Sequence, residues 1–130
     1  MSRSFTRMAK KILIIEDNGD HRRILVLQLR SIECEIIEAS NSEDGIEKAL
    51  AEVPDLILMD LGLPGIDGFE TTIRLKQNPQ TARIPVIAYT ALGRQFRDKA
   101  MAAGMADFFI KTDPPEVLLE LVRKYLRGLE

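Results

Sequence analysis

Short apolar runs alternate with amphipathic stretches along most of the chain. Five runs rich in Ile, Leu, Val and Phe are typical of strands, and they occupy residues 11–15, 35–39, 55–59, 85–89 and 107–110. Three of them are nearly continuous Ile, Leu and Val, which is typical of strands covered on both faces. The pattern therefore predicts strands that are buried between layers of helices.

The stretches between these runs repeat apolar residues at the spacing of one helix face. The second stretch does so at Ile46, Ala49, Leu50 and Val53, and Ser40 with Glu43 matches a capping box at its start. The last stretch does so at Leu118, Leu121, Val122 and Tyr125, after Pro114 and Pro115, which suit a helix entry. A broader apolar face at about 19–30 consists of Ile24, Leu25, Leu27 and Leu29. Helices are also expected at 67–76 and at about 95–103.

Five strands that alternate strictly with five helices indicate an α/β fold. Strands joined by helices pair in parallel with right-handed crossovers, so we expect a doubly wound sheet with helices on both faces. The 130 residues suffice for one domain with a proper core and are too few for two ordinary ones. We therefore expect one domain over residues 10–130, after a disordered tail over residues 1–9 that lacks the apolar segment of a secretory signal.

Charge and cysteine content narrow the function further. Lys and Arg number 18 against 20 Asp and Glu, so the net charge of -2 gives no basic footprint for nucleic acid. The single cysteine, Cys34, excludes an intrachain disulfide and a multi-cysteine zinc site, and it fits a reducing compartment. No apolar run approaches the roughly 18–20 residues that cross a bilayer. We expect a cytoplasmic protein without a nucleic-acid or membrane partner.

Polar residues follow four of the five predicted strands. Glu16 and Asp17 follow the first strand, Asp60 the third, Thr90 the fourth and Lys111 the fifth. Ligands of open parallel sheets bind beyond the carboxyl ends of the strands. Three carboxylates, one hydroxyl and one ammonium group are therefore expected at one rim. Each alone has a structural explanation as a cap, a turn residue or a surface residue, but their coincidence favours a functional site.

Clustered carboxylates repel one another unless a cation lies between them. Oxygen-only ligands favour Mg²⁺, and Glu16, Asp17 and Asp60 are the candidate ligands, with Gly62 offering a backbone carbonyl. Asp60 is then the candidate nucleophile, because a carboxylate can attack phosphorus to give an aspartyl phosphate. Mg²⁺, Lys111 and the hydroxyl of Thr90 can each take one peripheral phosphoryl oxygen. The small Ala91 after Thr90 leaves room for the phosphoryl donor.

Four motifs, in order along the chain, resemble those of the receiver domain of bacterial two-component response regulators. They are "ILIIEDN", "DLILMDLGLPGIDG", "PVIAYTA" and "DFFIK", and the resemblance spans about residues 10–126. It implies a flavodoxin-like fold with strand order 2-1-3-4-5. It implies that Glu16 and Asp17 are the acidic metal pair, that Asp60 is the phosphorylated aspartate and that Gly62 is the carbonyl donor. It also implies that Thr90 is the switch hydroxyl, Lys111 the phosphate lysine and Phe108 the switch aromatic.

Two positions depart from the family pattern. Thr112 follows Lys111 where most receivers have proline, so a trans peptide bond is expected there, since a cis bond before a residue other than proline costs about 2.5–4 kcal/mol. Phe108 lacks the hydroxyl of the tyrosine that is common at its position, so it can serve as an apolar switch only.

The resemblance implies a phosphoacceptor that takes a phosphoryl group from a histidine kinase or a phosphotransfer protein and then changes its affinity for an unknown downstream protein. Such a protein catalyses its own phosphoryl transfer and dephosphorylation, but it is not an enzyme acting on a separate substrate, and no ATP-binding motif is present. The last helix is expected to end at about Arg127, with Gly128 closing it, which favours a stand-alone receiver. His21 is expected to be a solvated residue of the first helix.

Three alternatives differ in class. A phosphorylation-independent scaffold with a receiver fold would keep only protein binding; the complete polar set argues against it, and Thr112 after Lys111 argues modestly for it. A haloacid-dehalogenase-like phosphatase needs a second Asp two residues after its nucleophile, whereas Gly19 lies two after Asp17. A flavodoxin-type FMN carrier needs a phosphate loop after the first strand, whereas "EDNGDHR" is acidic.

Overall fold

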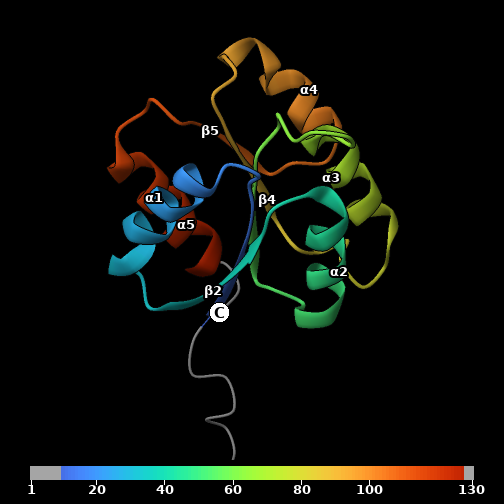
Figure 1. The fold of residues 1–130 in the computed structure, drawn as a ribbon, viewed down its shortest axis with the longest axis horizontal. Helices are drawn as coiled ribbons and strands as arrows, with labels where there is room; N and C mark the ends of the chain where they lie inside the picture. Colours follow the sequence, from blue (N-terminus) through green and yellow to red (C-terminus); the bar gives the residue numbers. More distant parts are fainter. Residues whose placement is uncertain (1–9, 128–130) are drawn as a thin grey trace, which may run out of the picture.

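The computed structural model describes residues 10–127, and the tail predicted over residues 1–9 lies outside the described residues, as do residues 128–130. It contains one five-stranded sheet with all neighbouring strands parallel, in the order β2-β1-β3-β4-β5 (Figure 1). This confirms the predicted α/β class and the strand order that the resemblance implied. The strands are β1 (Lys10–Ile15), β2 (Cys34–Ala39), β3 (Leu56–Met59), β4 (Val86–Thr90) and β5 (Asp107–Ile110). The helices are α1 (Gly19–Gln28), α2 (Ser42–Glu52), α3 (Gly68–Gln77), α4 (Arg97–Ala102) and α5 (Pro115–Arg127), with short 3₁₀ turns η2 (Leu29–Ser31) and η3 (Arg94–Phe96).

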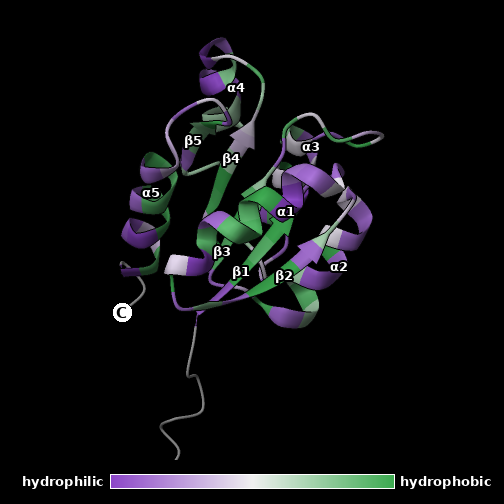
Figure 2. Cartoon of the chain, turned by 60° about the vertical axis from the view of Figure 1, so that its left-hand side comes forward, coloured by the Kyte–Doolittle hydropathy of each residue, from purple (hydrophilic) through white to green (hydrophobic). Residues whose placement is uncertain are grey.

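Two apolar cores lie on the two faces of the sheet. Successive residues of a strand point to opposite faces, so Leu13 and Ile15 of β1 belong to one core and Ile12 and Ile14 to the other. Helices α2, α3 and α4 cover the first core, and α1 and α5 cover the second (Figure 1). The hydropathy colouring shows the strands as a mostly green layer between helices whose outer faces are purple (Figure 2). This explains why the central strands read as continuous apolar runs.

Helix α2 differs from the prediction at both ends. Its N-cap is Asn41, whose Oδ1 accepts a hydrogen bond from the Asp44 N–H at 2.8 Å, so the capping box predicted at Ser40 and Glu43 was wrong. Asparagine fits the cap because its short side chain reaches back to the first free amides. Val53 lies beyond the helix, with a left-handed φ of 44° and 51% of its surface exposed. It therefore closes the helix instead of packing on the sheet.

The apolar face predicted for the first helix is narrower in the structure. Leu25 and Leu29 are buried, but Ile24 and Leu27 are 48% and 49% exposed. Residues four apart stack on one side of a helix, and the row that is fully buried runs from Leu25 in α1 to Leu29 in η2, while Val26 is partly buried against the same core. The sequence pattern predicted an apolar face of four residues, but it did not indicate which of them face the sheet.

The start of α3 packs directly against the backbone that follows β3, and this contact yields a first prediction. A Cβ at Gly68 would meet the carbonyl oxygen of Asp60 and would lie 2.8 Å from the Cα of Leu61. Both are backbone atoms, which cannot rotate away. We expect Gly68→Ala to lower the free energy of unfolding by about 2–3 kcal/mol, measured in urea.

A matched control for this prediction is available at Gly19, the first residue of α1. A Cβ there would have its nearest neighbour, an Arg22 side-chain nitrogen, at 3.9 Å. Gly19→Ala is therefore expected to be neutral or slightly stabilising, since Ala favours helix more than Gly. Equal losses in Gly68→Ala and Gly19→Ala would contradict the backbone-contact explanation.

Candidate functional site

The carboxyl ends of β1, β3, β4 and β5 border one cleft. Seven of the predicted residues line it, namely Glu16, Asp17, Asp60, Gly62, Thr90, Ala91 and Lys111. Asn18, His21 and Leu92 line it as well. The parallel order of the strands brings these residues together, because β1 and β3 are neighbours at the centre of the sheet and β4 and β5 follow on one side. Phe108 is not among the lining residues.

An acidic cluster forms the floor of the cleft. Glu16, Asp17 and Asp60 each offer a carboxylate oxygen, and these oxygens lie within 4.8 Å of one another. Glu16 and Asp60 are buried, whereas Asp17 is exposed. Three carboxylates with one ammonium group nearby leave an excess of negative charge. The oxygen donors and this excess charge fit a hard divalent cation such as Mg²⁺.

The buried carboxyl of Glu16 shows the electrostatic cost of this arrangement. Its pKa is raised from 4.5 to about 7, chiefly because burial removes water from the charged form, and also because the carboxylate of Asp60 is close. Two hydrogen bonds act in the opposite direction, from the Lys111 ammonium at 2.5 Å and from the Asn18 backbone N–H at 3.0 Å. Desolvation prevails, so Glu16 is partly protonated near neutral pH in the metal-free protein.

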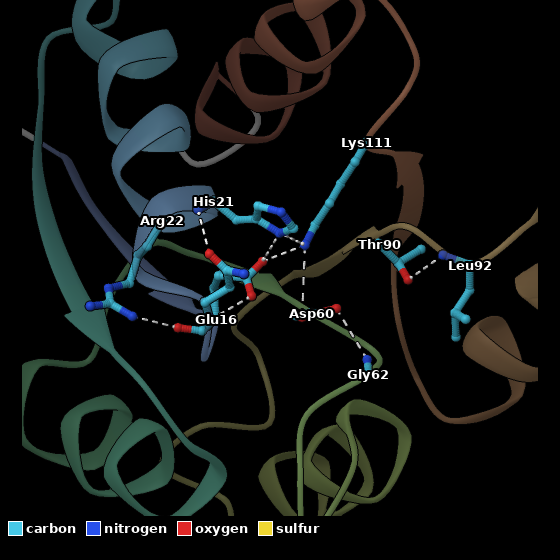
Figure 3. A network of polar contacts seen from close by, with 9 residues as sticks. Glu16, His21, Arg22, Asp60, Gly62, Thr90, Leu92 and Lys111 are labelled. Atoms are coloured by element: carbon cyan, nitrogen blue, oxygen red, sulfur yellow. Dashed lines mark hydrogen bonds and ion pairs between the residues drawn. The ribbon is translucent and has the colours of Figure 1, made fainter.

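Lys111 extends from the end of β5 across the cleft towards these carboxylates (Figure 3). Besides Glu16, its Nζ contacts His21 Nδ1 at 3.0 Å and lies 3.8 Å from Asp60 Oδ2. Its side chain is only 13% exposed. The Lys111–Thr112 bond is trans, like every other peptide bond between residues 10 and 127, which confirms the expectation for this loop. The absence of proline thus does not prevent the lysine from reaching the acidic cluster.

The carboxylate of Asp60 is oriented by its own loop. Its Oδ1 accepts a hydrogen bond from the Gly62 N–H at 3.1 Å, and its backbone N–H donates to the Ile15 carbonyl at 3.0 Å. Oδ2 is the oxygen on the side of Lys111. One oxygen is thus held by the backbone while the other faces the ammonium group. The predicted role of the Gly62 carbonyl stays a prediction.

Thr90 and Phe108 occupy different environments. Thr90 is fully buried at the end of β4, and its Oγ1 accepts a hydrogen bond from the Leu92 N–H at 3.0 Å (Figure 3). Phe108 pairs with Ala88 in the sheet and packs in the core on the α2–α3–α4 face, with 5% of its surface exposed. The switch roles predicted for Thr90 and Phe108 stay predictions.

His21 is a residue of the cleft that the sequence reasoning did not place there. Its side chain is 44% exposed, which agrees with the expected contact with solvent. Its Nδ1, however, contacts Lys111 Nζ and lies 3.9 Å from Glu16 Oε1. Asn18 caps α1 by accepting from the His21 N–H at 3.0 Å, which fixes where the helix begins. Asn18 is the sequence signal for this position, because an asparagine cap there places His21 in the first turn of α1, beside Glu16 and Asp17.

No helix within residues 10–127 combines the length and the apolar character that crossing a membrane requires.

Known proteins of one family match this chain over about nine tenths of its length. A model of the response regulator receiver domain matches residues 12–123. PilH of Pseudomonas aeruginosa is 32% identical over 120 residues, which are 91% of this chain and 98% of PilH. The response regulator PleD of Caulobacter vibrioides is 34% identical over 121 residues, which are 92% of this chain but only 27% of PleD. The chain therefore spans less than a third of the length of that relative.

Solved structures agree with this result. A putative response regulator from Chloroflexus aurantiacus has a TM-score of 0.86 at 28% identity, covering 92% of this chain and 98% of its own. The receiver domain of the sensor histidine kinase PA1611 from Pseudomonas aeruginosa, described with a magnesium ion coordinated in its active-site cleft, has a TM-score of 0.82 at 28% identity, covering 90% and 97%. With its sheet order, its acidic cleft and a family match over residues 12–123, the chain belongs to the response regulator receiver domain family.

Proposed function

We propose that this protein is a phosphoacceptor of a two-component system or phosphorelay, and that Asp60 receives the phosphoryl group from a histidine kinase or a phosphotransfer protein. One observation carries the proposal. Asp60 Oδ2 faces the Lys111 ammonium at 3.8 Å, inside a cluster of three carboxylates whose oxygens lie within 4.8 Å of one another. A carboxylate used only as a cap or a surface charge would not need a largely shielded cation partner beside two further acids.

The transfer step assigns a part to each side chain. Asp60 Oδ2 forms the new P–O bond, while the P–N bond to the donor histidine breaks and its nitrogen keeps the electron pair. Gly62 holds the other oxygen of Asp60 and leaves Oδ2 for attack. Lys111 supplies a positive charge to the phosphoryl oxygens as their charge spreads in the transition state.

Glu16, Asp17 and Asp60, with the Gly62 carbonyl, are the residues that we propose to hold Mg²⁺. When bound, the ion would neutralise the carboxylates and the transferring phosphoryl group. The pKa of Glu16, raised mainly by burial and in part by the nearby carboxylate of Asp60, supports this assignment, because a cation bound between the two groups would offset both costs. The magnesium ion described in the cleft of the PA1611 receiver domain supports it as well.

The signalling output is proposed to follow from the added charge. A phosphoryl group brings a charge of about -1.5 to -2 at neutral pH, which attracts Lys111 and the hydroxyl of Thr90. We propose that the Thr90 side chain turns towards the phosphoryl group to donate its O–H, that this movement carries Oγ1 away from the Leu92 N–H, and that the loop after β4 then changes position. The face made by α4, β5 and α5 then binds a downstream protein with altered affinity, as a shift between two packings.

Phosphorylation with a small acyl phosphate tests this function directly. Incubation with acetyl phosphate and Mg²⁺ should add one phosphoryl group, detected by intact mass and mapped to Asp60 after chemical trapping. Asp17→Asn should slow the reaction at least about tenfold, a loss of the size that disturbed metal sites show. Asp20→Asn, which alters a carboxyl of α1 that does not line the cleft, is the matched control and should react like the wild type. A wild-type protein that gains no mass would overturn the proposal.

A further inference from the structure

His21 occupies a constrained position at the mouth of the cleft. Its backbone N–H donates to Asn18 Oδ1 at 3.0 Å, so the first turn of α1 fixes its Cα beside the acidic pair. Its ring then reaches the ammonium of Lys111, a residue 90 positions away in the sequence, at 3.0 Å (Figure 3). The contact joins the start of α1 to the residue that follows β5, alongside the ion pair between Lys111 and Glu16.

The chemistry of the contact decides which partner donates. A lysine ammonium has three N–H donors and no acceptor, so His21 Nδ1 must accept with its lone pair and the ring proton must lie on Nε2. A second Lys111 donor is taken by Glu16 Oε1 at 2.5 Å. Asp60 Oδ2, at 3.8 Å, lies outside hydrogen-bond distance. Two of the three donors are therefore committed, and the groups nearest to the third are Asp60 Oδ2 at 3.8 Å and the ring of Tyr89, whose centroid lies 5.1 Å from Nζ.

We propose that His21 is a positioning residue for Lys111: together with Glu16 it anchors the ammonium so that the remaining N–H is presented to an oxygen of the group attached to Asp60. This inference rests on the proposed phosphoacceptor function for its catalytic consequence, but the anchoring itself does not. Lysine carries a flexible four-carbon stem, and a second anchor removes rotations that a single ion pair leaves free. Preorganised donors are worth more in a transition state than donors that must first be ordered.

The anchoring is tested in metal-free protein by the reactivity of Lys111 towards acetic anhydride, followed by peptide mass spectrometry. His21→Leu removes the acceptor and is expected to raise the acetylation rate of Lys111 severalfold. His21→Asn places an amide oxygen where Nδ1 lies and is expected to restore a rate near that of the wild type. Arg23→Leu makes the same kind of change at an exposed position of the same helix and serves as the control, with no effect on Lys111. Equal labelling in all variants would overturn the anchoring.

The catalytic consequence is tested by the initial rate of phosphorylation with acetyl phosphate and Mg²⁺, a small donor that needs no docking surface. His21→Leu is expected to slow the reaction about tenfold, the size of one lost hydrogen bond to a charged group. His21→Asn should recover most of this loss, and His21→Leu should have no further effect in a Lys111→Ala background, because both changes remove the same interaction. Thermal unfolding of each variant shows that the fold is retained.

The outcomes separate this inference from the proposed function. A wild-type protein that takes up no phosphoryl group contradicts the function, while the labelling still decides whether His21 anchors Lys111. A wild type that reacts normally, with His21→Leu reacting equally fast, overturns the positioning role even if Lys111 becomes easier to acetylate. Slower reaction in both His21→Leu and His21→Asn would also overturn it, since the Asn variant keeps the acceptor.

Discussion

Asp60→Asn is expected to take up no phosphoryl group from acetyl phosphate while keeping the stability of the wild type. An amide oxygen is too weak a nucleophile to attack phosphorus under these conditions. The fold should survive, because Asn has the same shape and its oxygen can still accept from the Gly62 N–H. The attraction to Lys111 is lost, but the repulsion from Glu16 and Asp17 is relieved. We therefore expect the free energy of unfolding to change by less than about 1 kcal/mol.

The measurement pairs intact mass after reaction with urea unfolding of the same preparation. Asp44→Asn changes a carboxylate on α2 that does not line the cleft and should react fully. If Asp60→Asn gained a full equivalent of phosphoryl group, another residue would be the acceptor. Loss of the reaction together with a large loss of stability would leave misfolding as its cause.

The same variant separates the phosphoacceptor from a phosphorylation-independent scaffold. A switch protein should capture its downstream partner from cells differently when residue 60 is Asp and when it is Asn. Identical partner capture by both forms, in cells where the wild type carries the phosphoryl group, would favour the scaffold. The family membership alone does not distinguish the two, whereas the geometry around Asp60 supports the first.

The second large effect concerns stability and pH. In metal-free protein the pKa of Glu16 is raised from 4.5 to about 7, mainly by burial. The folded state then binds more protons than the unfolded state between these pH values. The contribution of Glu16 to stability is therefore full below about 4.5 and is lost as the pH rises through about 7. The loss amounts to about 3 kcal/mol at most.

Glu16→Gln removes this titration, so the free energy of unfolding should fall less steeply as the pH rises from about 4.5 to about 7. Above pH 7 the variant is expected to be more stable than the metal-free wild type by about 1–3 kcal/mol, measured by urea unfolding in a chelator at a series of pH values. Added Mg²⁺ should stabilise the wild type, since a ligand that binds only the folded state shifts the equilibrium towards it, but should have little effect on the variant. Glu47→Gln, at an exposed position of α2, is the control and should keep the wild-type slope. A wild type whose stability rises between pH 5 and 7 would contradict the assignment.

The sequence by itself determined the class of the fold and the rim that carries the polar residues. Strands such as β3 are continuous apolar runs because both faces are covered, and this pattern can be read without coordinates. The placement of Asp60 and Lys111 at strand ends follows from the same reading, since parallel strands all end at one edge. The structure brings these residues into one cleft, and their chemical roles stay predictions.

Tertiary structure alone decided the features that depend on which surfaces meet. The row that faces the sheet buries Leu25 of α1 and Leu29 of η2, whereas Ile24 and Leu27 are exposed, and local spacing does not choose between such rows. The contact between His21 and Lys111 spans 90 positions, so it exists only once β1 and β5 have taken their places in one sheet. The elevated pKa of Glu16 has the same origin, because it depends on burial by neighbours that are distant in the sequence.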